Sequence, residues 1–412
     1  MKIGYACTPL KIPSKTTKSF IIKNYSEDLL INCISSNLKS LIDILNYNIS
    51  NEIFLFRISS DIVPFASHEI NTFDWEKYFK DDFYKIGNLI KKNSIRVSMH
   101  PGQYTVLNSQ NKDIVSKSIK DLEYHCKFLD NLNLNSTNKI ILHVGGVYNN
   151  KELAIDNFIN NYNSLSKNIK DRLVIENDEK NYTINDLLYI SEKCSIPIIY
   201  DNLHYSCYEG HLGDNHSILN SIKKTWNNYD GLIKVHYSEQ NETKKKGSHS
   251  STISCDKFLN YINSLGDLDI DIMTEVKDKD FSAIKCINIL NELKGILTEN
   301  AKLKELEDYK YYLKEKGDYV FEKSKDILYS EGIIEFYKFI DKFIYKEPEL
   351  EFIKKTLKEV YLKLEDNLNK SEINHFFKLF NDNKYQKAKE YLYKVSFKKN
   401  LYKELSMYYF YN

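Results

Sequence analysis

Eight short apolar segments, separated by longer amphipathic ones, constrain the fold of this chain more than any other feature. Each short segment is rich in β-branched and aromatic residues and has the length of a buried strand. The segments begin at Lys2, Glu52, Ile95, Lys139, Arg172, Pro197, Leu232 and Asp269. The stretches between them, such as SEDLLINCISSNLKSLIDIL, place apolar residues at three- and four-residue spacing, which is the period of a helix.

This alternation predicts an α/β fold, a (β/α)8 TIM barrel over residues 1–298. Several of the segments are apolar nearly throughout, as expected for parallel strands that are covered on both faces. The structural alternative is an open, doubly wound sheet. That alternative is disfavoured because no Gly-x-Gly-x-x-Gly turn follows the first predicted strand.

The character of the sequence changes after residue 298. Residues 299–412 carry helical patterns rich in Lys, Glu and Tyr, without a strand-like segment. Acidic side chains nearly balance the lysines there, so this region does not read as a strongly basic surface. We predict an all-helical C-terminal extension, to which the sequence assigns no role.

The composition narrows the class of protein. With 42% hydrophobic and 28% charged residues, the chain is typical of soluble globular proteins. Its net charge of +1 excludes a basic field over the whole molecule, so a nucleic-acid partner would need a local positive surface. The seven cysteines form no Cys-x-x-Cys pair, and no stretch approaches the roughly 18 apolar residues of a membrane span. We therefore expect a cytoplasmic protein with free thiols.

Potential metal ligands lie at the ends of six successive predicted strands. These residues are His100, His143, Glu176, Asp201, His236 and Glu275. In a (β/α)8 barrel the carboxyl ends of the strands form one mouth, where active sites lie. Residues far apart in sequence would therefore meet in a single ring. A ring of imidazoles and carboxylates is what a multi-metal hydrolytic centre requires.

Further histidines follow the strand ends in loops. His204 comes three residues after Asp201, His249 follows the seventh strand, and His68 follows the second. His211 and His216 also follow a strand end. A single histidine or glutamate at such a place is more often a hydrogen-bonded loop or core residue than a ligand. Six in register are harder to explain in that way, because crowded acids and imidazoles are costly without cations.

Lys234 precedes His236 by two residues, so both side chains are expected on the inner face of the seventh strand. A protonated lysine beside metal ions would be repelled. The lysine must therefore be neutral, pair with an acid such as Asp201 or Glu275, or be converted to a carbamate.

At these positions the sequence resembles the UV damage endonucleases. The resemblance runs in order from Met1 to about Thr298, and it leaves residues 299–412 uncovered. It rests on several long motifs rather than on one short signature. The motifs are MKIGYA, FRISSDIVPFASHE, SMHPGQYTVLNS, LHVGG, IENDE, IIYDNLHY, KVHYS followed by GSHS, and TEVKDK.

The resemblance implies a role for each matching residue. The implied metal ligands or near-metal residues are His100, His143, Glu176, Asp201, His204, His236, His249 and Glu275. The implied cofactor is Mn²⁺, in a cluster of up to three divalent ions, with a carbamylated Lys234. We expect Glu176, Lys234 and His68 to serve the catalytic step. Gln103 and Tyr104 match a pair that is pushed into the duplex at the lesion, and Tyr5 is a third expected DNA contact.

The expected function is hydrolysis of the phosphodiester bond on the 5′ side of UV photoproducts, with other lesions left open as substrates. The expected partner is damaged double-stranded DNA, bound by a monomer without a membrane. Two enzymatic alternatives are an abasic-site endonuclease of the endonuclease IV type and a metal-dependent sugar isomerase. A non-catalytic damage sensor is the third alternative, although binding alone does not need so many metal ligands.

Overall fold

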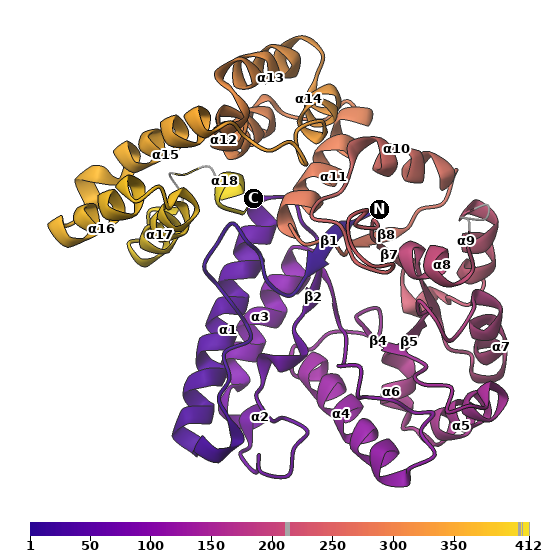
Figure 1. Cartoon of the computed structure of the whole chain (residues 1–412). Helices are drawn as coiled ribbons and strands as arrows, with labels where there is room; N and C mark the ends of the chain where they lie inside the picture. The colour runs from indigo at the N-terminus through magenta and orange to yellow at the C-terminus, as the bar shows by residue number, and fades with distance from the viewer. Residues whose placement is uncertain (211–214, 403–404, 406, 412) are drawn as a thin grey trace. The chain divides into compact units, whose positions relative to one another are not determined.

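The computed structural model describes residues 1–210, 215–402, 405 and 407–411 (Figure 1). His211 lies outside the described residues. The chain divides into two compact units. The barrel unit comprises Met1–Pro9, Ser14–Ile253 and Asn260–Ala283, and the helical unit comprises Leu10–Pro13, Ser254–Leu259 and Ile284–Asn412. The predicted boundary at residue 298 stays a prediction.

The barrel unit is a closed ring of eight parallel strands in sequence order, which confirms the predicted TIM barrel (Figure 1). Nearly every strand residue is buried, because the inner face fills the barrel and the outer face is covered by helices. The strands are β1 (Ile3–Ala6), β2 (Leu55–Ile58), β3 (Arg96–Met99), β4 (Lys139–His143), β5 (Leu173–Glu176), β6 (Ile198–Asp201), β7 (Lys234–Tyr237) and β8 (Asp271–Thr274).

The register of the strands aligns their functional ends. His143 on β4 pairs with Glu176 on β5, and Asp201 on β6 pairs with His236 on β7. Gly4 on β1 allows the first two strands to approach, since a Cβ there would lie 1.8 Å from the carbonyl oxygen of Leu55. The barrel therefore closes with its potential ligands side by side.

The starts of the strands are held by buried ion pairs. Arg96 pairs with Asp271 at 2.9 Å and also donates to the carbonyl of Asp230. Lys139 pairs with Asp230 at 2.5 Å. Charges at this end of the barrel thus neutralise one another within the protein.

Helices and short 3-10 turns connect the strands, and polar caps begin many of them. Ser26 accepts a hydrogen bond from the Leu29 amide at the start of α1, and Thr183 forms a capping box with Asp186 at the start of α7. The helices are α1 (Glu27–Ser50), α2 (Trp75–Tyr78), α3 (Lys80–Lys92), α4 (Lys112–Asn131), α5 (Lys151–Ser164), α6 (Lys167–Arg172), α7 (Ile184–Cys194), α8 (Asn202–Tyr208), α9 (Asn215–Lys223), α10 (Cys255–Ser264) and α11 (Asp280–Leu293), and the turns are η1 (Ile22–Asn24), η2 (Ser60–Ile62) and η3 (Asn228–Asp230).

The helical unit is a bundle whose core is rich in tyrosine. The ring of Tyr309 packs on Tyr408 with centroids 4.3 Å apart, and the hydroxyl of Tyr337 donates to buried Glu305 at 2.6 Å. Its elements beyond α11 are α12 (Glu299–Lys316), α13 (Asp318–Ser330), α14 (Ile333–Asp341), α15 (Leu350–Leu364), η4 (Glu365–Asn367), α16 (Lys370–Asn381), α17 (Tyr385–Lys398) and α18 (Met407–Tyr411). The predicted all-helical character of this region is confirmed.

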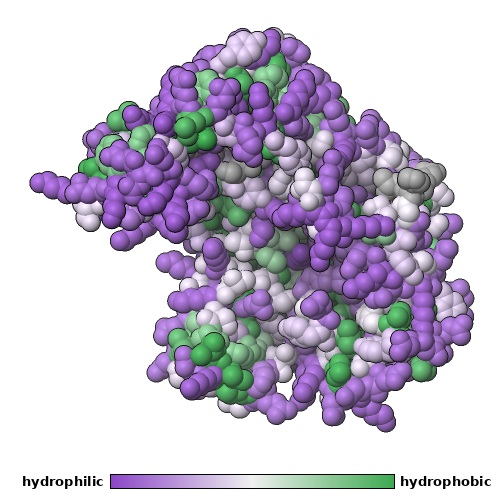
Figure 2. Space-filling view, viewed as in Figure 1, coloured by the Kyte–Doolittle hydropathy of each residue, from purple (hydrophilic) through white to green (hydrophobic). Residues whose placement is uncertain are grey.

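The surface and the thiols fit the composition. Figure 2 shows mainly hydrophilic side chains over the face in view, interrupted by small hydrophobic spots. The seven cysteines are free thiols in this structure. Among the described residues, no helix is both long enough and apolar enough to cross a membrane.

Candidate metal centre

Glu176 lies at the middle of the polar groups at the mouth of the barrel. The residue is only about 2% exposed. One carboxylate oxygen lies 2.6 Å from Nδ1 of His236, and the other lies 3.1 Å from Nε2 of His100 and 3.6 Å from Nε2 of His143. The structure therefore brings the ends of β3, β4, β5 and β7 together around one carboxylate.

The ligand atoms form two groups that share Glu176. One group is His100, His143 and Glu176, and the other is Glu176, Asp201 and His236. Within each group the candidate ligand atoms lie within 4.8 Å of one another. This is the arrangement that a carboxylate bridging two cations would need.

The two carboxylate oxygens of Asp201 have different surroundings. As the N-cap of α8, it accepts the His204 amide on Oδ1 at 2.8 Å. Its Oδ2 is buried and makes no hydrogen bond to any residue that the structure describes, although it lies 4.0 Å from Nδ1 of His204. The sequence spacing of three residues places both side chains on the same side of this first helical turn.

Several buried polar atoms in the cluster lack a hydrogen-bond partner among the described parts of the chain. Besides Oδ2 of Asp201, these atoms are Nδ1 of His143 and Nε2 of His236. A buried polar atom without a partner costs free energy, so such atoms are rare unless a ligand satisfies them. Imidazole nitrogens and carboxylate oxygens are ligands of divalent transition metals.

The surroundings of His100 point to a cation in the same way. Its Nδ1 lies 3.0 Å from the carbonyl oxygen of Pro101, and its Nε2 faces the carboxylate of Glu176. Both neighbours are acceptors, whereas a neutral imidazole carries only one N–H. A second proton or a metal ion must therefore lie on one of the two nitrogens. The residues present fit a divalent cation.

Glu275, at the end of β8, extends the cluster on the side of β7. Its Oε1 lies 3.2 Å from Nδ1 of His236 and accepts a hydrogen bond from the guanidinium of Arg57 on β2. Burial raises the pKa of Glu275, but Arg57 and His236 outweigh it and lower that pKa to about 2. The carboxylate is thus held ionised and oriented.

Other groups are shifted by the same crowding. Burial raises the pKa of Glu176, but the imidazoles of His236 and His143 hold it well below its ordinary value. Burial lowers the pKa of His100 to about 4. Burial alone would lower the pKa of His204, but the carboxylates of Asp201 and Glu176 outweigh burial and raise that pKa to about 9. Perturbed groups concentrated in one place are typical of functional sites.

Lys234 is fully buried on β7 and donates a hydrogen bond to the hydroxyl of Ser98 on β3, at 2.7 Å. Burial, together with the neighbouring charges of Arg57 and Arg96, lowers its pKa well below the ordinary value. The neutral amine is therefore favoured over the ammonium ion, which is one of the three alternatives that the sequence left open.

The remaining predicted residues lie in other surroundings. His249 forms an isolated bridge with Gln240 in the loop after β7. Gln103 and Tyr104 are exposed in the loop after β3, and Tyr104 is 70% exposed. His68 and Tyr104 line one cavity of about 500 Å³. Tyr5 is buried in β1, where its hydroxyl donates to Asn48 at 2.9 Å.

Three supporting residues were missed by the sequence reasoning. Arg57 orients Glu275, and Ser98 accepts from Lys234. Asn177 exchanges hydrogen bonds with the backbone of Asp201, and its carbonyl oxygen lies 3.0 Å from Nδ1 of His204. A charged residue inside an otherwise apolar strand was the available signal for Arg57. Nothing comparable marked Ser98.

Comparison with known proteins relates this chain to one family. The family model described as UV-endonuclease UvdE matches residues 1–307. A UV DNA damage endonuclease from Clostridium perfringens is 48% identical over 396 residues and covers 96% of both chains. This chain belongs to the UV-endonuclease UvdE family. The predicted family and the predicted enzyme class, an endonuclease, are thereby confirmed.

Other relatives match a smaller share of this chain. A UV DNA damage endonuclease from Bacillus cereus is 35% identical over 308 residues, which is 96% of that relative but 72% of this chain. The crystal structure of SacUVDE matches with a TM-score of 0.68 and 40% identity, covering 99% of that chain and 71% of this one. The match to the Clostridium perfringens relative therefore extends over nearly the whole chain, whereas the matches to these two proteins leave more than a quarter of it uncovered.

Proposed function

We propose that this chain is a metal-dependent DNA repair endonuclease that hydrolyses the phosphodiester bond 5′ to a UV photoproduct and leaves a 3′-hydroxyl. The observation that carries the metal dependence is the buried carboxylate of Glu176 shared by two groups of potential ligands. Family membership supports the substrate class. The proposed resident ion is Mn²⁺, which is the ion that the resemblance to the UV damage endonucleases implies, and carboxylates are among the ligands that suit it.

The ligand sets follow from the two groups. His100 and His143 would hold one ion, Asp201 and His236 would hold the second, and Glu176 would bridge them. Glu275 would complete the second set, because it lies beside His236.

His204 and His249 are proposed for a third ion. If Nδ1 of His204 donates to the Asn177 carbonyl, its Nε2 is left as the ligand atom. For His249 the support is the sequence resemblance alone.

Divalent ions at these positions would neutralise the anionic phosphate, lower the pKa of a bound water and stabilise the leaving 3′-oxygen. The chain itself supplies the orientation. Asn177 and Arg57 hold Asp201 and Glu275, respectively, in place. Preorganised ligands need no rearrangement when the phosphate arrives.

Lys234 is proposed to carry a carbamate. Carbamate formation joins the nitrogen of a neutral amine to the carbon of CO2 with release of one proton, and burial favours that neutral amine here. The added anion would contribute to the neutralisation of the metal ions. Lys234→Met would test whether the nitrogen of this side chain is needed, because methionine keeps most of the volume of lysine without a nitrogen.

Gln103 and Tyr104 are proposed to enter the duplex where a damaged pair has been extruded. A lesion weakens pairing and stacking, so its extrusion costs less than that of a normal base. The exposed Tyr104 ring offers a stacking face, and the amide of Gln103 can hydrogen-bond to orphaned bases. His68 is proposed to contact the lesion region, since it shares a cavity with Tyr104. Tyr5 has no part in this proposal, because its side chain is buried.

A nicking assay tests the function. Purified protein supplied with Mn²⁺ should nick irradiated plasmid, and untreated plasmid should stay intact. The position of the cut, mapped on an end-labelled duplex with one photoproduct, should be the bond on the 5′ side. Equal nicking of both plasmids, or none with any divalent ion, would contradict the proposal. We further propose that the enzyme acts as a cytoplasmic monomer, which light scattering of the purified protein tests for the oligomeric state.

Glu176→Gln tests the metal centre separately from the reaction. The variant keeps the volume of the side chain but loses its charge, so it should fold, lose bound metal and lose nicking. Glu192→Gln on the exposed surface of α7 is the matched control and should retain both. Unchanged metal content in Glu176→Gln would remove this residue from the centre.

A further inference from the structure

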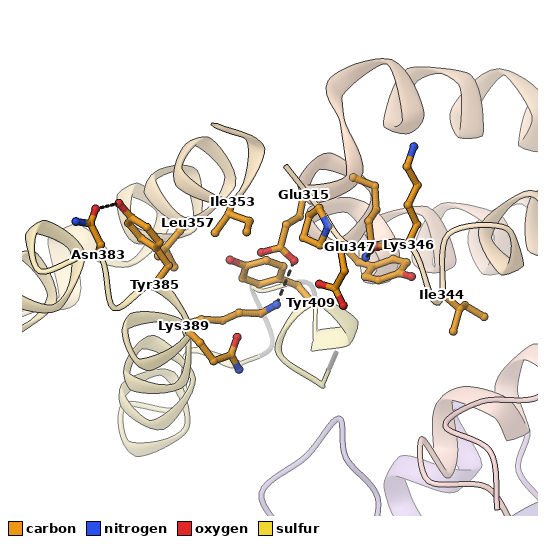
Figure 3. Close-up of a pocket in the computed structure, with 14 residues that line it drawn as sticks. Glu315, Ile344, Lys346, Glu347, Ile353, Leu357, Asn383, Tyr385, Lys389 and Tyr409 are labelled. Carbon is orange, nitrogen blue, oxygen red and sulfur yellow. Dashed lines mark hydrogen bonds and ion pairs between the residues drawn. The ribbon is translucent and has the colours of Figure 1, made fainter. Parts of the chain in front are cut away.

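The helical unit contains a cavity that has no part in the proposed nuclease centre. Its volume is about 410 Å³, which lies within the range of small-molecule sites. It is formed where α12, α15, α17 and α18 meet the segment between α14 and α15. Figure 3 shows its side chains converging from these separate elements. All of them belong to the helical unit.

The floor of the cavity is a buried ion pair. Lys389 on α17 donates to Glu315 on α12 at 3.2 Å, and both side chains are more than nine-tenths buried. The ammonium group of Lys389 also lies 4.0 Å from the ring centre of Tyr409. Figure 3 shows the three side chains together in the middle of the site. A donor and an acceptor therefore stand next to each other on one polar floor.

The walls of the cavity are aromatic and aliphatic. Tyr385 lies on one side with Ile353 and Leu357, as Figure 3 shows, and its hydroxyl donates to Asn383 at the rim. That hydrogen bond fixes the ring, so a flat ligand would meet a preoriented stacking face. Gln386 adds an exposed amide beside it.

The mouth of the cavity favours an anion. Lys316, Lys346 and Glu347 line it, and the ammonium group of Lys346 lies over the ring of Phe343, 5.5 Å from its centre, on a flexible side chain. Lys316 also donates to the carbonyl of Lys346, which holds the segment after α14 in place.

We propose that this cavity binds a nucleotide. The base would stack on Tyr385 and meet the Glu315–Lys389 floor, since every nucleobase presents a donor beside an acceptor on one edge. The phosphate would lie at the mouth near Lys346. Two sources share this chemistry: a free mononucleotide and an unpaired nucleotide within single-stranded DNA.

Calorimetric titration of the full chain tests the proposal. The probes are the four deoxynucleoside monophosphates, a nucleoside without phosphate, inorganic phosphate and a short undamaged single-stranded oligodeoxynucleotide. We expect at least one nucleotide to bind about tenfold or more tightly than both the nucleoside and inorganic phosphate, because base and phosphate are recognised together. An affinity for inorganic phosphate equal to that for the nucleotides would overturn the assignment of a base site, and so would no binding by any nucleotide or oligonucleotide.

Rim variants locate the binding without disturbing the buried pair. Tyr385→Ala should weaken nucleotide binding about tenfold or more, because the stacking face is lost. Lys346→Ala should weaken nucleotide binding and reduce the salt dependence of that binding. Lys342→Ala, an exposed lysine of the preceding segment that does not line the cavity, should change nothing. Binding that survives both rim variants would place the ligand elsewhere and overturn the proposal.

The two sources are separated by the same titrations. Tighter, Tyr385-dependent binding of the oligonucleotide than of any mononucleotide would assign the cavity to single-stranded DNA. The reverse order would assign it to a free nucleotide. Neither result depends on nicking, so the fate of this proposal is distinguishable from that of the nuclease centre.

Discussion

Asp201 offers the sharpest single perturbation, because its two oxygens have separable tasks. Oδ1 caps α8 by accepting the His204 amide, and Oδ2 is buried in the cluster without a hydrogen bond. In Asp201→Asn only the amide oxygen can accept from the His204 amide. The NH2 group must therefore replace Oδ2 and face the proposed cation with its hydrogens. Asp201→Ala removes both the cap and the ligand.

The magnitudes follow from these tasks. Loss of an N-cap costs about 1 kcal/mol, so Asp201→Ala without metal should unfold about 2–4 °C below Asp201→Asn, which loses the same buried charge but keeps the cap. Asp201→Asn keeps the cap and removes a buried charge, so without metal it should unfold at or above the parent temperature. Residues that only orient a metal ligand change the metal affinity by roughly 10–100-fold when they are replaced. Replacement of Asp201, a proposed ligand itself, should therefore lower the metal affinity by at least about 100-fold.

Two assays read the two tasks. Thermal unfolding in EDTA reports the cap, and metal content after gel filtration, followed by nicking of irradiated plasmid, reports the ligand. The reasoning predicts that Asn separates the readouts, with normal stability and lost metal, whereas Ala loses both. Full metal content in Asp201→Asn would refute the assignment of Oδ2. Equal destabilisation of the two variants in EDTA would refute the assignment of the cap.

Three further predictions concern other parts of the barrel unit. Gln103→Ala combined with Tyr104→Ala should weaken binding to a photoproduct-containing duplex, while the metal content stays normal. Tyr84→Ala on the exposed face of α3 is the control and should leave both binding and metal content unchanged. Equal affinity of the double variant and the parent would exclude the insertion of Gln103 and Tyr104 into the duplex. Arg96→Ala should destabilise the barrel by about 3 kcal/mol in urea unfolding, because it removes the ion-pair partner of buried Asp271. A loss below about 1 kcal/mol would contradict this. Lys234→Met should fold but lose nicking at neutral pH, and high-resolution density of the parent should show a carboxyl group on Nζ; an active methionine variant would exclude a role for the lysine.

The sequence predicted the barrel because strand ends are local signals. Each strand is a short apolar run, and the polar residue that ends it is visible without any knowledge of packing. Closure of the barrel then converts sequence order into proximity, which is why His143 meets Glu176 and Asp201 meets His236. No long-range contact had to be known in advance.

Contacts that depend on packing between distant elements were not visible. Arg57 reaches Glu275 only because β2 and β8 both flank β1 in the closed ring. Tyr5 lies in one of the family motifs, but its buried hydroxyl donates a hydrogen bond to Asn48 of α1. The sequence alone does not show that these two residues come together. In the helical unit, the Glu315–Lys389 pair joins residues 74 positions apart that look like ordinary surface charges in a helical pattern.

The most direct measurement is anomalous diffraction from crystals of the protein grown with Mn²⁺. The account predicts manganese peaks beside Glu176, one bounded by His100 and His143 and another by Asp201 and His236. Peaks confined to other surfaces, or a mouth without manganese in crystals whose protein nicks irradiated DNA, would contradict the claim that these strand ends hold the catalytic ions.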